Sequence, residues 1–222
     1  MLAADSILPF LLTAVAAYLI GSVDFSIIIT RFFARTDVRQ HGSGNAGTTN
    51  VLRTAGKLPA ALTFVGDFCK CVIAVLIGRW LFHFFGTTMV APLYITGTAG
   101  IGCILGHMYP LFFSFRGGKG VATTAGLALM VEPRAFAIGM SVFILLLVLT
   151  RIVSLSALIA VGIMPFAAFA VYIHAGPKVA LQGAGVMLCA GLIVFVRHRA
   201  NIRRLMTHSE PRIALRHGGK CG

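Results

Sequence analysis

The sequence predicts an all-α, polytopic integral membrane protein with about seven transmembrane helices, one of them a short segment. Hydrophobic residues make up 58% of the 222 residues and charged residues only 11%, whereas a soluble domain carries about 25% charged residues. A water-soluble core of this length cannot bury so much apolar surface, so lipid must cover much of it. Long apolar runs and an uneven placement of the basic residues predict the same fold class.

Apolar runs of roughly the length of a membrane crossing, about 20 residues, lie at 7–33, 58–80, 89–113, 135–150, 152–173 and 178–196. The segment 121–131, closed by Glu132-Pro133-Arg134, is also apolar. With about eleven residues it is too short to cross alone, so it is either a half-helix or a crossing where neighbouring helices thin the bilayer.

The basic residues favour a crossing by 121–131. Seven spans place the N-terminus outside and the C-terminus in the cytoplasm, and only Arg79, Arg134 and Lys178 then lie outside. Lys70 lies within a span, and the cytoplasmic side holds Arg31, Arg35, Arg39, Arg53, Lys57, Arg116, Lys119, Arg151, Arg197, Arg199, Arg203, Arg204, Arg212, Arg216 and Lys220. If 121–150 were one kinked span, the tail would change sides and this bias would disappear. The positive-inside rule therefore favours seven spans.

The chain has a net charge of +13, which in a soluble protein would suggest nucleic acid. In a membrane protein the positive charge must face anionic lipid, a phosphorylated substrate, or both. No basic residue precedes Arg31, so we expect no cleaved signal peptide. The lone Cys69-x-Cys71 pair has no partner at metal spacing, so we expect no metal site. Residues 1–222 are expected to form one domain, with 197–222 as a basic cytoplasmic tail.

A first polar loop, residues 41–53, reads His-Gly-Ser-Gly-Asn-Ala-Gly-Thr-Thr-Asn-Val-Leu-Arg. Its three glycines allow backbone N–H groups to approach an anion closely. A helix starting near Asn50 would present its N-terminus to the same anion, and Arg53 would bind phosphate oxygens. The alternative is a flexible polar turn between spans. The candidate contacts are Ser43, Gly44, Asn45, Thr49, Asn50 and Arg53.

A second loop, residues 106–123, places Arg116 and Lys119 on either side of Gly117-Gly118. Here again a mobile backbone can carry donors between two cations. Gly120 follows the lysine, so no hydroxyl is placed for Mg²⁺ and an ATP-binding loop is not expected. His107 lies within the membrane-embedded part and is a functional candidate. The alternative is a histidine that a backbone carbonyl satisfies.

The third motif, residues 197–205, reads Arg-His-Arg-Ala-Asn-Ile-Arg-Arg-Leu. Attraction to a membrane surface explains most of its arginines, but it does not explain His198 and Asn201, which share one face of a helix. Ser154, at another cytoplasmic end, either lines the same mouth or packs between helices.

Two further acidic positions lie inside predicted spans. Asp67 and Lys70 stand three residues apart, and an unpaired charge in hydrocarbon is costly, so we expect a structural ion pair. Asp24 in the first span has no evident partner in the sequence.

Together these strings resemble one family, the acyl-phosphate:glycerol-3-phosphate acyltransferases of bacterial inner membranes (PlsY). The resemblance rests on GSGNAGTTNVLR at 42–53, GHMYPLFFSFRGGKGVAT at 106–123 and RHRANIRRL at 197–205, with support from GSVDF at 21–25, DFCK at 67–70 and VSLSA at 153–157. It covers nearly the whole chain in the right order. Asp24 and His208 depart from the family's pattern, while Glu210 is kept.

The resemblance implies a seven-span inner-membrane enzyme with its active site at the cytoplasmic face. It would transfer an acyl group from acyl phosphate to the 1-hydroxyl of glycerol 3-phosphate. The products would be phosphate and 1-acyl-glycerol 3-phosphate (lysophosphatidate), in the first step of phospholipid synthesis. No cofactor is expected, and the enzyme that supplies acyl phosphate would be a functional partner. Carried over by position, the substrate contacts are Ser43, Asn45, Arg53, Lys119, Ser154, His198 and Asn201.

An acyl phosphate is already activated, so the enzyme must collect two anions and align the attacking hydroxyl. Arg53 and Lys119 are the expected catalytic cations, and Arg116, Gly117 and Gly118 complete the substrate site. His107 and His198 are the candidate bases. Neither has a carboxylate nearby in sequence, so we hypothesise that the substrate's own phosphate takes the proton.

Two other functions compete with this interpretation. A transporter for a phosphorylated solute would also place cations and glycines in the membrane, but it usually shows paired repeats and a site near the midplane. The sequence has no such repeat, and all three motifs fall at one predicted face. A scaffold for anionic lipid would explain the basic tail but not residues 42–53.

Overall fold

The structure, a computed structural model, describes residues 6–87 and 90–213. Within these residues the regular elements are all helices. They are α1 (Ile7–Gly21), α2 (Phe25–Ala34), η2 (Val38–Gln40), α3 (Thr48–Thr54), α4 (Lys57–Phe84), α5 (Pro92–Met108), η3 (Leu111–Phe113), α6 (Val121–Val131), α7 (Pro133–Thr150), α8 (Val153–Tyr172), η4 (Ile173–Ala175), α9 (Pro177–Arg197) and α10 (Arg199–Met206). Arg216 and Lys220 of the predicted tail lie outside the described residues.

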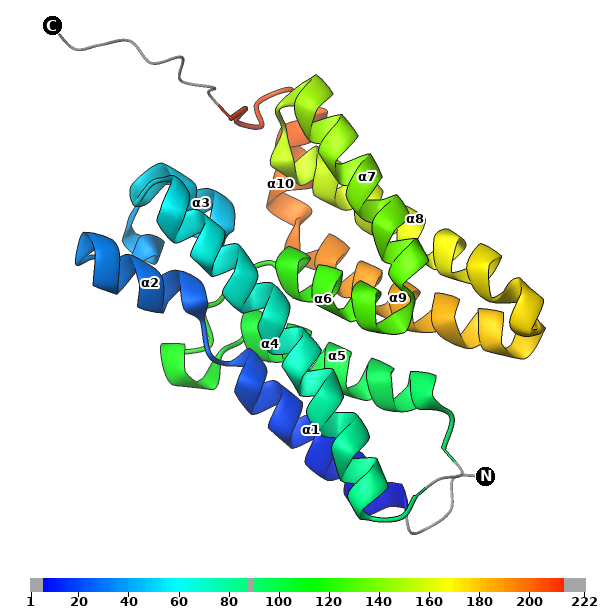
Figure 1. Ribbon diagram of the computed structural model, residues 1–222. Helices are drawn as coiled ribbons and strands as arrows, with labels where there is room; N and C mark the ends of the chain where they lie inside the picture. The colour runs from blue at the N-terminus through cyan, green and yellow to red at the C-terminus, as the bar shows by residue number, and fades with distance from the viewer. Residues whose placement is uncertain (1–5, 88–89, 214–222) are drawn as a thin grey trace, which may run out of the picture.

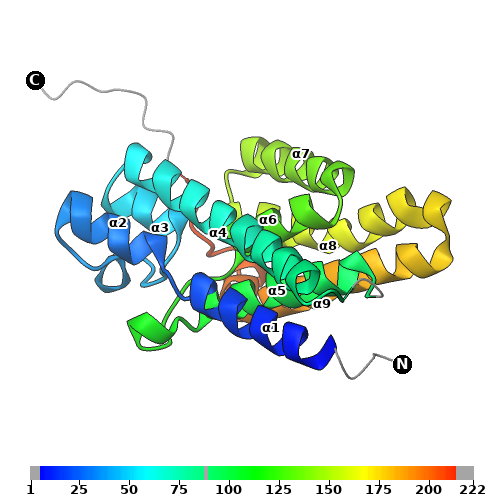
Figure 2. The same ribbon diagram turned by 60° about the horizontal axis from the view of Figure 1, so that its bottom comes forward.

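The long helices form two groups with α6 between them (Figure 1). Helices α1, α4 and α5 pack against one another in the first group, and α8 packs against both α7 and α9 in the second. Helix α6 contacts members of both groups. Gly126 allows this close approach, because a Cβ there would lie 2.5 Å from the carbonyl oxygen of Phe68 on α4. Figure 2 shows α2 and α3 at one end of the bundle and the α8–α9 turn at the other.

The bundle has the character of a membrane protein, as predicted. Helices α4, α7, α8 and α9 and the segment Ile7–Ala34 are long and apolar enough to cross a bilayer. Large apolar side chains cover the outer surface, and Val148 and Leu149 on α7 are each 70% exposed, as lipid-facing residues would be. Helices α5, with 17 residues, and α6, with 11, fall short of that length. The count of seven spans therefore stays a prediction.

The short helix α6 ends inside the bundle, where its last carbonyl groups need donors. Eleven residues give a helix of about 16 Å, roughly half the hydrocarbon thickness. The Arg79 guanidinium donates to the carbonyl of Met130 at 3.0 Å, and the Tyr172 hydroxyl donates to that of Val131. These two side chains satisfy carbonyls at the end of the helix that have no partner within it.

The predicted first span, 7–33, is broken between α1 and α2. Asp24, fully buried, caps α2 by accepting from the backbone N–H groups of Ser26 at 3.0 Å and Ile27 at 3.3 Å. The Ser26 hydroxyl donates to the same carboxylate oxygen at 2.5 Å. Asp24 therefore has a local partner that hydropathy does not reveal, because an N-cap starts a new helix there.

Candidate active site

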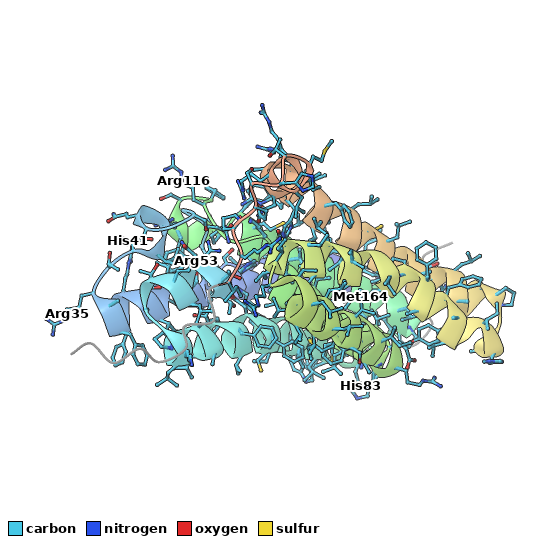
Figure 3. All side chains as sticks on the ribbon, turned by 90° about the horizontal axis from the view of Figure 1, so that it is seen from above. Arg35, His41, Arg53, His83, Arg116 and Met164 are labelled. Carbon is cyan, nitrogen blue, oxygen red and sulfur yellow. The ribbon has the colours of Figure 1, made fainter. Side chains whose placement is uncertain are left out.

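The three motif loops meet at one cavity of about 970 Å³. The first loop leads into α3, the second joins α5 to α6, and the third is the junction of α9 and α10. Figure 3 shows Arg53 and Arg116 at the end of the molecule where Arg35 and His41 lie, with Met164 and His83 farther along the bundle. Of the predicted site residues, the cavity wall includes Ser43, Gly44, Asn45, Thr49, Asn50, Arg53, His107, Arg116, Gly117, Lys119, Ser154, His198 and Asn201.

Asn50 shapes the first loop from within. It is 2% exposed, and its amide nitrogen donates to the carbonyls of Val38 at 2.8 Å, His41 at 2.9 Å and Asn45 at 3.1 Å. Its amide oxygen accepts from the backbone N–H of Ser43 at 3.1 Å. Three of these bonds stay inside the loop and the fourth ties it to η2, so Asn50 fixes the loop's shape, and α3 starts at Thr48, ahead of it.

Arg53 extends from the last turn of α3 to the cavity wall. It makes no hydrogen bond or ion pair with any residue in 6–87 or 90–213. Its guanidinium is therefore free to bind an anion in the cavity.

Gly117 and Gly118, whose backbone we expected to offer donors to an anion, already use their N–H groups within the second loop. The N–H of Gly117 donates to the carbonyl of Met108 at 3.2 Å, and that of Gly118 to the carbonyl of His107 at 3.1 Å. These N–H groups are therefore already bonded and are not free donors for an anion. Gly118 is absent from the cavity wall, because its Cα lies between His107 and the first loop. The first turn of α6, at Val121 and Ala122, lines the cavity instead.

Arg197 holds the other side of this glycine pair. Its guanidinium donates to the carbonyls of Gly118 at 3.2 Å and Gly117 at 3.4 Å, and it stacks over the Tyr109 ring at 5.1 Å. The third motif is thereby joined to the second. We did not expect this role for Arg197, because attraction to the membrane surface accounted for the arginine in the sequence.

A chain of hydrogen bonds joins Lys119 to the end of the described chain. The Lys119 ammonium donates to the Asn201 amide oxygen at 2.5 Å, and the Asn201 amide nitrogen donates to Glu210 at 2.5 Å. The same carboxylate accepts from the Ser154 hydroxyl at 2.7 Å and from Arg204 at 2.6 Å. Glu210 therefore orients Asn201 so that the amide oxygen faces Lys119.

The cavity environment shifts the pKa values of Lys119 and Glu210, the two ionisable groups in this hydrogen-bond network. Burial lowers the pKa of Lys119 to about 8, although Glu210 acts in the opposite direction. Burial raises the pKa of Glu210, but the hydrogen bonds from Ser154, Asn201 and Arg204 outweigh it, and the net pKa lies below the usual value. At neutral pH the cavity thus holds a charged ammonium and a charged, fully bonded carboxylate.

His198 is fixed in one tautomer at the α9–α10 junction. Its Nδ1 lies 2.9 Å from the carbonyl of Val194, and a carbonyl only accepts, so Nδ1 carries the proton. Burial lowers the pKa of His198 to about 4. The ring is therefore neutral at pH 7, with an unprotonated Nε2 available on a residue of the cavity wall.

His107 belongs to a buried polar cluster beneath the second loop. Asp67 and Lys70 form an ion pair at 2.8 Å, and Lys70 also donates to the carbonyl of Val23 at 2.7 Å. The Nδ1 atom of His107 lies 3.1 Å from the Lys70 ammonium and 3.4 Å from Asp67. A carboxylate distant in sequence is therefore close to His107 in space.

The positions of the acidic and sulfur-containing side chains bear on metal binding. Within residues 6–87 and 90–213, no group of three or more His, Cys, Asp or Glu side chains gathers that could hold a metal ion.

A comparison with known families matches residues 11–208 to the model of the family described as glycerol-3-phosphate acyltransferase. The chain belongs to this family. The glycerol-3-phosphate acyltransferase of Pseudomonas aeruginosa (strain LESB58) is 40% identical over 203 residues, which cover 90% of this chain and 97% of the relative. The glycerol-3-phosphate acyltransferase of Clostridioides difficile (strain 630) is 41% identical over 207 residues, which cover 93% of this chain and 97% of that relative.

Two solved structures of a family member are similar in fold. The crystal structure of PlsY (YgiH), an integral membrane glycerol 3-phosphate acyltransferase, in its glycerol 3-phosphate form has a TM-score of 0.75 at 37% identity, covering 92% of this chain and 96% of that one. Its lysophosphatidic acid form has a TM-score of 0.73 at 36% identity. The predicted family and the all-α membrane fold are thus confirmed.

In this acyltransferase the sequence motifs located the cavity but not the contacts that hold it together. Arg39, Arg197, Arg204 and Glu210 line the cavity and were not predicted as site residues. Glu210 had a detectable signal, since it is kept from the family's third motif. The arginines had none, because charge alone does not distinguish an arginine bound to a loop from one at a lipid surface.

Proposed function

We propose that this protein transfers an acyl group from acyl phosphate to the 1-hydroxyl of glycerol 3-phosphate in a bacterial inner membrane, releasing lysophosphatidate and phosphate. One observation carries the proposal: cations and an apolar wall share a single cavity. The cavity wall carries Arg53, Arg116 and Lys119. Asp67 and Glu210 are its acidic side chains among the described residues, and each is paired with a cation. Two repelling phosphates need such an excess of positive charge.

The apolar wall suits an acyl chain attached to one of those phosphates. It is formed by Phe64 on α4, Phe143 and Leu147 on α7, and Val153 and Ala157 on α8. Phe64 is 37% exposed and lies on the outer surface of the bundle. A donor with an anionic head and a long apolar tail would therefore place its head among the cations and its tail along these helices.

The site must align the 1-hydroxyl of glycerol 3-phosphate with the acyl carbonyl and stabilise the charge on the leaving phosphate. The 1-hydroxyl oxygen attacks the acyl carbonyl carbon, and an ester C–O bond forms as the C–O bond to the donor's phosphate breaks. The leaving phosphate takes the bonding electron pair. Arg53 and Lys119 would hold the phosphates and stabilise the charge that develops on the leaving group.

The hydroxyl proton can pass to a phosphate oxygen of the substrates or to a histidine. We propose that a phosphate oxygen takes it, and that His198 orients the hydroxyl through its unprotonated Nε2. His107 has its Nδ1 engaged by the buried ion pair. Replacement of either histidine by alanine should lower kcat by less than about 10⁴-fold, because a positioned base contributes typically 10² to 10⁴. A larger loss with substrate binding intact would identify that histidine as an essential base.

We further propose seven crossings, with the N-terminus outside and the cavity at the cytoplasmic face. The contact of all three motif loops in one cavity supports this orientation, because the alternative with one kinked span would place the third motif on the other side. Cysteine labelling of intact cells at exposed loop positions tests the orientation.

The activity is tested with purified protein in detergent, given acyl phosphate and glycerol 3-phosphate, with lysophosphatidate measured by mass spectrometry. We expect product that depends on both substrates, and strong loss in Arg53→Ala. If no product forms and sealed vesicles containing the protein take up glycerol 3-phosphate, the acyltransferase proposal is wrong and transport is the function.

A further inference from the structure

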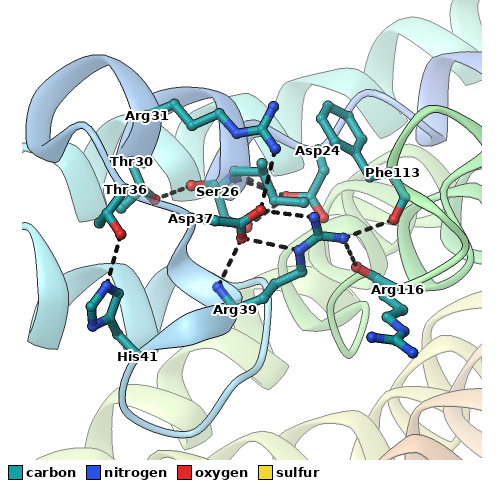
Figure 4. A network of polar contacts seen from close by, with 11 residues as sticks. Asp24, Ser26, Thr30, Arg31, Thr36, Asp37, Arg39, His41, Phe113 and Arg116 are labelled. Carbon is teal, nitrogen blue, oxygen red and sulfur yellow. Dashed lines mark hydrogen bonds and ion pairs between the residues drawn. The ribbon is translucent and has the colours of Figure 1, made fainter.

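Arg39, in η2 just before the first motif loop, contacts the second motif loop. Its guanidinium donates to the carbonyl of Phe113 at 2.8 Å and to that of Arg116 at 3.3 Å. These carbonyls lie 74 and 77 residues away in the sequence. Figure 4 shows the guanidinium between Asp37 on one side and the two carbonyls on the other. Arg39 follows α2 and precedes the glycine-rich loop, so the contact spans two segments that both line the cavity.

Asp37 fixes the direction in which Arg39 points. The carboxylate accepts from Arg39 Nε at 3.0 Å and Nη2 at 2.8 Å, a two-point contact, and it accepts from the Arg39 backbone N–H at 3.0 Å. The hydrogen bonds from Arg39 lower the pKa of Asp37 to about 2. Such a fork contact holds a guanidinium in one orientation, which leaves Nη1 to reach the second loop.

The turn that Arg39 holds has an unfavourable backbone. Ser114 and Phe115, which lie between the two carbonyls, both have a φ of 58°. Left-handed backbone is uncommon for residues other than glycine and persists where surrounding contacts impose it. Phe115 is also 54% exposed, so little side-chain packing holds it there. Backbone hydrogen bonds hold the pair from within the turn, from the Phe115 N–H to Pro110 at 3.0 Å and from the Arg116 N–H to Phe113 at 3.3 Å. The bonds from Arg39 to both sides of the pair add the constraint that fixes the turn relative to the rest of the molecule.

We propose that Asp37 and Arg39 are positioning residues that hold the Phe113–Arg116 turn and thereby set the spacing between the two phosphate-facing loops. This inference rests on the proposed function, because the spacing matters only if both loops contact phosphate groups. The turn lies within the second loop and leads directly into Gly117 and Lys119, so a turn released from Arg39 moves these two residues relative to Arg53 on the first loop.

The geometry of the contact distinguishes positioning from a simple charge effect. A guanidinium can bond a carboxylate with two atoms and still donate from a third, whereas a lysine ammonium is a point charge on a flexible stem. Arg39→Lys therefore keeps the charge but loses the bridge. Arg35→Gln is the matched control, since Arg35 lies four residues earlier, is exposed and forms no hydrogen bond or ion pair with any described residue.

The test measures the turn and the reaction separately, in full-length protein in lipid nanodiscs. Hydrogen–deuterium exchange of peptides covering 111–118 reports the turn without any substrate. In Arg39→Gln and Arg39→Lys we expect exchange there to rise on the order of tenfold, with helix α4 unchanged. With palmitoyl phosphate and glycerol 3-phosphate, kcat/KM should fall about 100-fold, as a 1 Å misplacement costs. Arg35→Gln should match the wild type in both measurements.

Each contrary result has a defined meaning. Unchanged exchange in Arg39→Gln, or full rescue of kcat/KM by Arg39→Lys, would overturn the inference. Faster exchange with unchanged kinetics would show that the turn does not position the reaction. If Arg39→Gln fails to fold, Asp37→Asn replaces it, because it removes the charged two-point contact that orients the guanidinium. Arg31→Gln is then the control, because Asp37 also pairs with Arg31 at 3.3 Å. A wild type that forms no lysophosphatidate would refute the proposed function, while the exchange measurement would still decide the role of Arg39 in the turn.

Discussion

Gly118→Ala should disable the site by pushing the first and second loops apart. A Cβ on Gly118 would lie 2.2 Å from His107 Nε2 and 2.3 Å from the carbonyl oxygen of Ala46. The φ of Gly118 is not in the left-handed region, so the obstacle is contact and not backbone strain. His107 cannot easily give way, because its other ring nitrogen lies 3.1 Å from the Lys70 ammonium, and Ala46 belongs to the loop that Asn50 fixes.

The size of the effect follows from these distances. Ordinary contact with a Cβ begins near 3.4 Å, so the second loop must move by about 1 Å, and a misplacement of that size costs about 100-fold in rate. We therefore expect kcat/KM to fall about 100-fold in Gly118→Ala. Gly185→Ala on α9 is the matched control, because nothing lies within 4 Å of the Cβ it would add.

The assay is initial-rate formation of lysophosphatidate from purified variants, with thermal unfolding measured in parallel. Gly185→Ala should retain wild-type rates. If the kcat/KM of Gly118→Ala lies within about threefold of the control at equal stability, the packing of Gly118 does not set the spacing of the loops.

Three further predictions concern charge and helix ends. Because the pKa of Lys119 is lowered to about 8, the Lys119 ammonium loses its proton as pH rises through that value. In a pH profile, wild-type kcat/KM should therefore decline above about pH 8. The decline should disappear in Lys119→Arg, whatever the absolute rate of that variant. Glu210→Ala should reduce kcat/KM about tenfold or more, because hydrogen bonds to a charged group contribute about 1.5–3 kcal/mol, whereas the exposed neighbour Ser209→Ala should leave it unchanged in the same assay. Arg79→Gln should lower the free energy of unfolding by about 0.5–1.5 kcal/mol, because its bond to the Met130 carbonyl is solvent-exposed and contributes no more than a typical hydrogen bond, and thermal unfolding should show no change for the exposed His83→Gln on the same helix.

Local sequence signals were sufficient to predict the short helix. Residues 121–131 form α6 with those bounds, because Gly120 in a left-handed conformation precedes the helix and Pro133 follows its end. The sequence also predicted a pairing of Asp67 with Lys70, which the i, i+3 spacing places on one helix face. These features depend on neighbours in the chain, so a pattern can reveal them.

The break in the first span could not be predicted from hydropathy, because the apolar run continues through it. Asp24 caps α2 through Ser26 and Ile27, and a carboxylate two residues before a serine was a usable N-cap signal. We assigned the residue to a continuous span, which left it without a partner.

The contacts that organise the site were beyond the reach of the sequence. Arg39 and Arg197 bond groups 74 to 80 residues away, and Glu210 bonds Ser154 56 residues away, and such contacts exist only after the helices have packed. For the same reason the sequence suggested that the N–H groups of Gly117 and Gly118 were free. In the structure they donate to carbonyls at the start of the second loop, those of Met108 and His107. Residue types thus predicted where the cavity lies, while packing decides which groups face it.

In the proposed reaction the cavity holds two phosphates, one that stays with the product and one that leaves. The most direct test follows the reaction of purified protein by ³¹P NMR with acyl phosphate and glycerol 3-phosphate, and in parallel with acyl-CoA as donor. We expect one inorganic phosphate released for each lysophosphatidate formed, and no product from acyl-CoA. Lysophosphatidate formed from acyl-CoA, or phosphate released without any ester, would contradict the proposed reaction.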